Sequence, residues 1–314
     1  MIIVGVLTMI LNKGKIIKQE NYAIFEEPYY EPVGNEIIDF QVAFKNKRPI
    51  SLVGPTGCGK TTFAEYMAWK LRQDLITGMK DGSIEVAKLS EGEKQQNGNI
   101  MFPYIEIPCH EDLTETHLIG RYDFDNNWIP GPLYIGAKNG GIVLLDEIVE
   151  SRKDAIVLLH GLTDDRRVLH VSRKGEVLVP PDDFMVVICY NPGYQVKSKD
   201  LKPSTRQRFP TIEMNYPPQE IEEKILVKKT GIDDCNAKKL VVLANHIRDA
   251  KNNDAIDLQE GASTRLLIMA AEHYLTYKEL GYSPDLTHSA RINIFNPISN
   301  EDTDKEALEK MLAW

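Results

Sequence analysis

Short apolar runs separated by polar stretches occupy the first two thirds of the chain, and this pattern predicts buried strands that alternate with helices. After the first run, Phe63, Met67 and Leu71 recur every fourth residue, as on the inner face of a helix. Such alternation is typical of an α/β fold built on a parallel sheet flanked by helices. The predicted strands are residues 50–53, 104–108, 142–145, 184–189 and 211–214.

The last third has a different pattern, with apolar residues three or four positions apart, which predicts helices alone. A chain of 314 residues exceeds the usual size of one core, so we expect two domains. Residues 1–35 are predicted as a lead-in, 36–216 as the α/β domain and 217–314 as a helical domain. Ser263 is expected to cap the longest of these helices.

Four connecting segments also carry predictions. Residues 74–99 are rich in Gly, Lys, Glu, Gln and Asn and are expected to form an exposed excursion. A single helix is predicted over about 151–162, and a tight turn with two aromatic residues at 124–128. Alternating apolar residues around a Gly-bearing turn predict a hairpin at 168–179, either a plain edge hairpin or a partner-facing one.

The segment after the first predicted strand fits the phosphate-binding pattern G-x-x-x-x-G-K-[ST] and precedes a predicted helix, which is the context this pattern requires. Its glycines let backbone N–H groups approach phosphates, and the helix N-terminus adds positive charge. Lys60 can reach the outer phosphates and Thr61 can bind magnesium. The predicted nucleotide-binding residues are Gly54, Pro55, Thr56, Gly57, Cys58, Gly59, Lys60, Thr61 and Thr62.

A second set of polar residues follows two other predicted strands. Asp146 and Glu147 end the apolar run 142–145, and strand alternation is expected to send their side chains in different directions. Asp146 can then hold the magnesium shell while Glu147 orients and deprotonates the attacking water. The alternative is two carboxylates that cap a helix. Asn191 follows a strand predicted to lie alongside and can bind the water or the terminal phosphate.

Composition narrows the class of protein. Acidic residues outnumber basic ones by 46 to 37, a formal charge of −9, which argues against a protein that mainly coats nucleic acid. Four widely spaced cysteines suggest neither a disulfide framework nor a metal site, and they fit a reducing cytoplasm. His110 and His117 lie seven residues apart, and no metal site is predicted there.

The apolar start, residues 1–11, is too short to span a bilayer and lacks a cleavage site. A first strand and a true start at Met9 are both open readings.

The chain resembles the AAA+ ATPases of the MoxR group, and within it the CbbQ/NirQ/NorQ branch. The resemblance covers about residues 27–265, whereas the remaining tail is similar only in being helical. The chain departs from the family patterns in two places. Its 74–99 segment is longer than in the branch, and D-E-I-V-E replaces the D-E-I-N-R string of the MoxR group, which favours the narrower branch. The strings that carry it are EPYYEPVG (27–34), GPTGCGKT (54–61), CHEDLT (109–114), GRY (120–122), GPL (131–133), LDEIVESRKD (145–154), LTDDRR (162–167), YNPGYQ (190–195), DLKPSTRQRF (200–209) and EGASTR (260–265).

The resemblance implies a role for each matching residue. It makes Asn191 the sensor 1 residue, Arg265 the sensor 2 residue and Arg208 the finger offered to a neighbouring subunit, with Arg206 as a second candidate. Lys60 and Thr61 match Walker A, and Asp146 and Glu147 match Walker B. Residues 168–179 match the pre-sensor-1 insert and 120–128 the insert in the second helix.

The same resemblance implies ATP and Mg²⁺ as ligands, a helical lid, a ring that is expected to be a hexamer, and a von Willebrand factor A domain partner. The implied client enzyme is Rubisco or nitric oxide reductase, and no residue pattern selects between them.

Two other functions remain open from the residues. A small-molecule kinase could use the same phosphate loop, but it would have no use for an outward arginine finger or an inserted hairpin, and it would not form a ring with ATP. A nucleic-acid translocase is the other, with Arg173 and Lys174 at the predicted hairpin tip as its best support. Net acidity weighs against it.

Overall fold

The computed structural model describes residues 23–81, 83, 101–192, 201–253, 255, 258, 260–299 and 302–312. The predictions for residues 1–11, and those for 82 and 84–99 of the expected excursion, lie outside these ranges.

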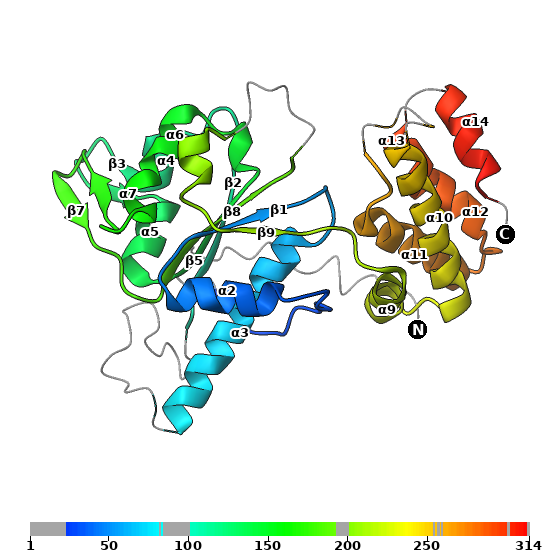
Figure 1. The fold of residues 1–314 in the computed structure, drawn as a ribbon, viewed down its shortest axis with the longest axis horizontal. Coiled ribbons are helices and arrows are strands. Elements are labelled where there is room, and N and C mark those ends of the chain that lie inside the picture. The colour runs from blue at the N-terminus through cyan, green and yellow to red at the C-terminus, as the bar shows by residue number, and fades with distance from the viewer. Residues whose placement is uncertain are drawn as a thin grey trace.

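Five parallel strands form the central sheet, which confirms the predicted α/β fold (Figure 1). In β8 every residue is buried, as expected for a continuous apolar run in a sheet covered on both faces. The sheet order is β2-β5-β8-β1-β9. The strands are β1 (Ile50–Val53), β2 (Tyr104–Pro108), β5 (Gly141–Asp146), β8 (Phe184–Tyr190) and β9 (Thr211–Glu213).

Helices cover both faces of this sheet, and strand alternation divides the apolar side chains between two cores. In β5, Val143 and Leu145 pack on one side, whereas Ile142 and Leu144 pack on the other. Phe63, Met67 and Leu71 pack from α3 into the second core, as predicted. That side carries α2 (Glu36–Lys45) and α3 (Lys60–Lys80), and the first side carries α4 (Glu115–Ile119), α5 (Pro132–Asn139), α6 (Lys153–Leu158) and α7 (His160–Thr163).

Two local predictions were wrong. The excursion does not begin at residue 74, because α3 continues to Lys80 and Leu75 still packs against the second core. Nor is 151–162 one helix: a 3₁₀ turn, η3 (Ile148–Glu150), precedes α6 and α7, and the chain bends at Leu159. There Gly161 lies so close to the next segment that a Cβ atom on it would be 2.6 Å from the Val168 carbonyl oxygen.

Two β-hairpins project from the first side of the domain. The predicted hairpin is confirmed as β6 (Leu169–Val171) paired with β7 (Glu176–Leu178). The predicted turn at 124–128 joins two short strands that the sequence pattern did not indicate, β3 (Gly120–Tyr122) and β4 (Trp128–Pro130). Asp123 forms this turn by accepting hydrogen bonds from the backbone N–H groups of Asp125 and Asn127.

From Gln219 onward the chain is helical and lies beside the sheet domain, joined to it through α9 (Figure 1). Ser263 caps α11, as predicted, but the longest helix in this region is α10, with 19 residues against 16. Among the described residues no helix is long and apolar enough to cross a membrane. After the short helix α8 (Pro203–Arg206), the elements are α9 (Gln219–Thr230), α10 (Asp234–Asn252), α11 (Thr264–Glu279), α12 (Leu286–Ala290), the π-helix η5 (Arg291–Phe295), α13 (Asn296–Ile298) and α14 (Asp302–Lys310).

A buried ion pair ties three of these helices together. Glu222 of α9 is fully buried. Its carboxylate accepts hydrogen bonds from the Nη1 and Nη2 atoms of Arg248 in α10, at 2.8 and 2.7 Å. Thr264, at the start of α11, donates to the same carboxylate at 2.6 Å. The Arg248 Nε atom donates to the Ala262 carbonyl oxygen. The start of α11 is therefore fixed by the buried charges of α9 and α10.

Removing one partner of this pair should destabilise the helical region, because an uncompensated buried charge remains. We expect Glu222→Ala to lower the free energy of unfolding by about 3–5 kcal/mol, measured by chemical denaturation. Glu309→Ala is the matched control, since it breaks a half-exposed pair with Arg291 and should cost at most about 1 kcal/mol. Equal losses in the two variants would contradict the role given to the buried pair.

Candidate nucleotide-binding site

The phosphate loop lies between β1 and α3, and its glycines are required by geometry. Gly57 and Gly59 have φ angles of +68° and +103°, which side chains disfavour. A Cβ atom on Gly54 would lie 2.1 Å from the Met214 carbonyl oxygen. The loop therefore packs tightly against the end of β9 while its backbone stays free of side chains where phosphates would approach.

Lys60 is folded back onto the loop. Its Nζ atom donates to the carbonyl oxygens of Gly54, at 2.8 Å, and Pro55, at 3.0 Å. The side chain is buried, yet Lys60 also lines the cavity in front of the loop. In this arrangement two carbonyl oxygens of the loop hold the ammonium group beside the cavity.

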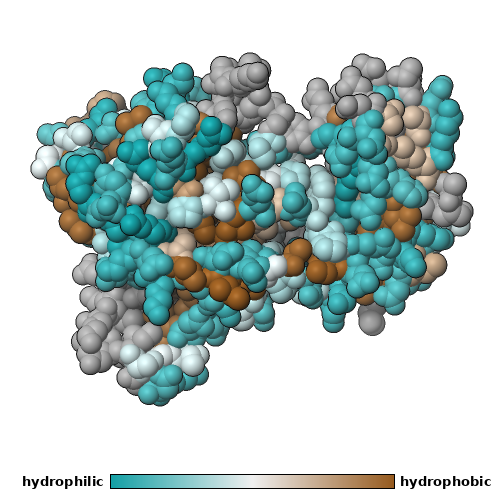
Figure 2. All heavy atoms as spheres, viewed as in Figure 1, coloured by the Kyte–Doolittle hydropathy of each residue, from teal (hydrophilic) through white to brown (hydrophobic). Residues whose placement is uncertain are grey.

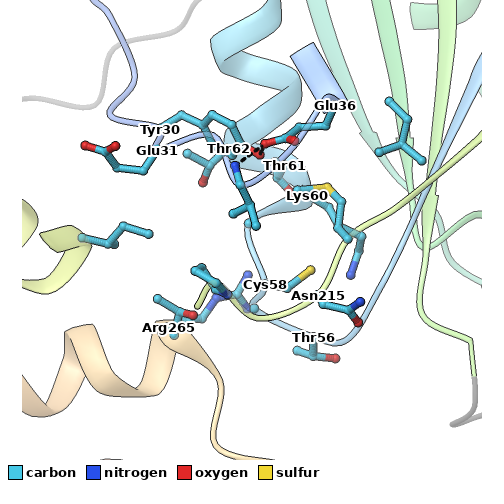
Figure 3. A pocket seen from close by; sticks show the side chains of 18 of the residues that line it. Tyr30, Glu31, Glu36, Thr56, Cys58, Lys60, Thr61, Thr62, Asn215 and Arg265 are labelled. Atoms are coloured by element: carbon cyan, nitrogen blue, oxygen red, sulfur yellow. Dashed lines mark hydrogen bonds between the residues drawn. The ribbon is translucent and has the colours of Figure 1, made fainter. Parts of the chain in front are cut away.

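A cavity of about 700 Å³ opens in front of the loop, which is large enough for a nucleotide. Thr56 to Thr62, Asp146, Glu147 and Arg265 all line it, so the structure brings these predicted residues together. Gly54, Pro55 and Asn191 instead line a second cleft behind the loop. Figure 3 shows Arg265, from the start of α11, across the loop from Tyr30 and Glu36.

The segment before α2 forms part of the cavity wall, and sequence reasoning missed it. Tyr30 stacks against Phe63 and Tyr66 of α3, with ring centroids 5.1 and 5.5 Å away. Glu36 accepts hydrogen bonds from the N–H groups of Val33 and Gly34, both at 2.7 Å, and from the Tyr30 hydroxyl. Burial raises the pKa of Glu36, but these hydrogen bonds outweigh it and the net shift is downward. The segment EPYYEPVG was the available signal.

The helical region supplies a further part of the wall through Ile225, Lys229, Ile268 and Met269. These residues lie far from the loop in sequence, so no local pattern could indicate them.

Asp146 ends β5, and Glu147 leaves it in the left-handed conformation, with φ 52° and ψ 47°. Strand alternation therefore does not set the direction of Glu147, contrary to our expectation, and both side chains line the cavity. Glu147 makes no capping hydrogen bond to η3, which disfavours the capping interpretation. Burial raises the pKa of its carboxyl; Lys60 opposes this effect, and Asp146 adds to it.

Asn191 follows β8, next to both β5 and β1, as predicted. Its Nδ2 atom lies 3.0 Å from the Thr56 hydroxyl, so it contacts the phosphate loop although it does not line the main cavity. The Thr56 hydroxyl also lies 2.7 Å from Glu260, just before α11, and the Tyr216 hydroxyl donates to the Thr56 carbonyl oxygen. Sequence reasoning gave Glu260 no role of its own.

Neither Arg206 nor Arg208 lines this cavity. Arg208 donates from Nη1 to the Ser204 carbonyl oxygen, and its Nε atom is buried without a hydrogen-bond partner among the described residues. Arg206, at the end of α8, is exposed.

The structure shows how the cysteines are buried and what His117 contacts. Cys58, Cys109 and Cys189 are buried and Cys235 is exposed. Burial raises the pKa of the Cys58 thiol, and it raises that of Cys109 to about 12. Within the described ranges no cluster of three His, Cys, Asp or Glu residues could hold a metal, and His117 forms a capping box with Thr114.

These residues fit a nucleotide with magnesium. The glycine backbone, the helix N-terminus and Lys60 suit phosphates, while the Thr61 hydroxyl and the Asp146 carboxylate are the hard oxygen donors that magnesium prefers.

Two family models match the chain, an AAA domain (dynein-related subfamily) over residues 93–209 and a CbbQ/NirQ/NorQ C-terminal domain over residues 222–314. Protein CbbQ of Hydrogenophilus thermoluteolus is 43% identical over 255 residues, 80% of this chain and 84% of that protein. Protein NorQ of Paracoccus denitrificans is 37% identical over 300 residues, 95% of this chain and 97% of that protein.

Among solved structures, a RuvB variant from Thermotoga maritima has a TM-score of 0.50 and 14% identity, and the match covers 83% of this chain and 71% of the RuvB chain. That likeness shows the fold alone. Together with the phosphate loop and the cavity, these findings define a P-loop ATPase of the AAA+ class. The chain belongs to the CbbQ/NirQ/NorQ family within the MoxR group.

Proposed function

We propose that this chain is a magnesium-dependent motor that assembles into a ring, with a hexamer expected, and activates a client enzyme in the cytoplasm. The partner is a von Willebrand factor A domain protein, and the client is of the Rubisco or nitric oxide reductase class. The observation that carries the ring is the separation of Arg206 and Arg208 from the cavity of their own chain. The family relationship supports the activator role.

The hydrolytic roles follow from the cavity wall. Thr61 and Asp146 would hold a magnesium ion, which would neutralise charge on the phosphate oxygens. Lys60 exchanges its two carbonyl partners for phosphate oxygens. Glu147 accepts the proton of the attacking water, and its raised pKa brings the carboxylate closer to that task near neutral pH.

The arginines divide between two subunits. Arg265 lines the cavity of its own chain and contacts its own nucleotide. Arg208 stands outside the cavity of its own chain, and in the proposed ring its guanidinium stabilises charge on ATP bound to the neighbouring subunit. Arg206 remains the second candidate for this finger.

The two hairpins form one surface for the partner. Lys174 of the β6–β7 turn lies over the rings of Trp128 and Tyr134, at 5.5 and 5.6 Å, which joins this hairpin to β4. Phe124 of the β3–β4 turn is fully exposed, and Val177 of β7 is 57% exposed. Figure 2 shows this hydrophobic surface at the edge where β7 lies. Exposed apolar residues gathered in this way are typical of an interaction site.

The same contact weakens the nucleic-acid alternative. The sequence offered Lys174 as support for nucleic-acid binding. In the structure, however, its ammonium group also pairs with Glu176 at 2.9 Å. Of the two basic residues at the tip, Arg173 is exposed and Lys174 is partly buried.

Glu147→Gln should bind ATP with magnesium but hydrolyse it about 10² to 10⁴ times more slowly, because the group that activates water is lost. Lys60→Ala should instead lose nucleotide binding. Turnover and binding are measured separately, by phosphate release and calorimetry. Glu115→Gln is the control, since Glu115 lies on α4 outside the cavity. Wild-type turnover by Glu147→Gln would show that another group activates the water.

Arg208→Ala should bind ATP and hydrolyse it poorly. Arg166→Ala, which removes an exposed arginine that pairs with Asp164, should hydrolyse ATP at the wild-type rate. Mixing Arg208→Ala with Lys60→Ala subunits should restore activity, because some interfaces then join an intact loop to an intact finger. Native mass measurement with ATP reports the ring and the exchange of subunits. Absence of recovery in exchanged rings would exclude a finger that acts between subunits.

Phe124→Ser should leave basal ATP hydrolysis nearly intact and abolish its stimulation by the von Willebrand factor A domain partner. The control is Leu280→Ser, which removes another exposed apolar side chain, 64% exposed, from the helical region. Stimulation is measured as the ATPase rate against partner concentration. The hairpins are not the partner site if both variants respond like the wild type.

A further inference from the structure

A chain of hydrogen bonds runs from the helical region to Asn191. The chemistry of its groups fixes which of them donates and which accepts. Thr56 Oγ1 lies between Glu260, at 2.7 Å, and Asn191 Nδ2, at 3.0 Å. A carboxylate only accepts hydrogen bonds, and a hydroxyl carries a single proton. Thr56 therefore donates to Glu260 and can only accept from Asn191. The amide must then turn its NH₂ group, and not its carbonyl oxygen, toward the phosphate loop.

Glu260 reaches Thr56 because the helical region is seated on the loop. A Cβ atom on Gly57 would lie 2.8 Å from the Ser263 side chain, so the cap of α11 touches the loop backbone. Tyr216, in the linker between the two regions, bonds the Thr56 carbonyl oxygen at 3.3 Å, and Arg248 stacks over its ring at 4.1 Å. Thr56 is therefore held at two points, its hydroxyl by Glu260 and its carbonyl oxygen by Tyr216.

We propose that Glu260 is a positioning residue that acts through Thr56 to hold the Asn191 amide with its NH₂ toward the terminal phosphate of ATP. This inference rests on the proposed function, since it takes Asn191 as the residue that contacts that phosphate. An amide NH₂ has two hydrogens, so one stays on Thr56 while the other remains for a phosphate oxygen. If the helical region lifts, the Thr56 hydroxyl loses Glu260 as its acceptor and can donate to the amide oxygen instead, which turns an acceptor toward the phosphate. Seating of the helical region and recognition of ATP are thereby coupled.

The test compares the Kd of a non-hydrolysable ATP analogue with that of ADP by calorimetry on the full chain. Thr56→Val has the same shape but no hydroxyl, and it should reduce the preference for the ATP analogue about three- to tenfold, the worth of one hydrogen bond. Thr56→Ser keeps the hydroxyl and should keep the preference. Glu260→Gln, whose amide can either donate or accept, should also reduce it.

If Glu260 acted through its negative charge alone, Glu260→Gln would increase the preference for the ATP analogue, which is the opposite of the expected loss. Glu213→Gln removes a carboxylate from the cavity wall without touching the chain of hydrogen bonds, and it should leave the preference for ATP unchanged or increase it.

A double variant separates positioning from general damage to the loop. Thr56→Val combined with Asn191→Ala should discriminate no worse than Asn191→Ala alone, because Thr56 acts only through that amide. Additive losses, or an unchanged preference in Thr56→Val, overturn the inference while the role of Asn191 stands. An unchanged preference in Asn191→Ala overturns that role in the proposed function and the inference with it.

Discussion

Parallel pairing of β5, β8 and β1 is the constraint on which the site depends. The register sets Leu145 against Ile188 and Val53 against Tyr190, so the three strands end at one edge of the sheet. Backbone bonds continue past that edge, from the Gly54 N–H to the Tyr190 carbonyl oxygen. The loop, the acidic pair and Asn191 can meet only because these buried strands stay in register, since a slip of one residue would displace the end of one strand from the next by about 3.3 Å.

The helical region completes what the sheet begins. The start of α11 is held by the buried charges of Glu222 and Arg248, and this start carries Ser263 and Arg265 to the phosphate loop. Arg248 also stacks on Tyr216 in the linker. Packing inside the helices and geometry at the nucleotide cavity are therefore parts of one network, which is consistent with motors in which the two regions move relative to each other.

Much of this arrangement could be predicted from the sequence, because buried strands and phosphate loops leave local signals. The run 184–189 identified β8, and the G-x-x-x-x-G-K-[ST] spacing identified the loop. Contacts between distant segments leave no such signal. Glu36 and Glu260 resemble ordinary surface acids, and only the fold reveals that one holds the wall of the cavity and the other bonds Thr56.

Local patterns also failed where tertiary packing decides the backbone. Composition indicated a loop from residue 74, but packing of Leu75 extends α3. The left-handed conformation of Glu147 and the close approach of Gly161 to Val168 are features that the spacing of apolar residues cannot report.

The burial of three of the four thiols gives the chain a ready attachment point. Cys58, Cys109 and Cys189 are shielded and hold their protons, so a maleimide dye at neutral pH would react first at Cys235, on the surface of α10. A single fluorophore could thus be placed on the helical region of the native sequence without removing any cysteine. Its emission would follow that region through each round of nucleotide exchange.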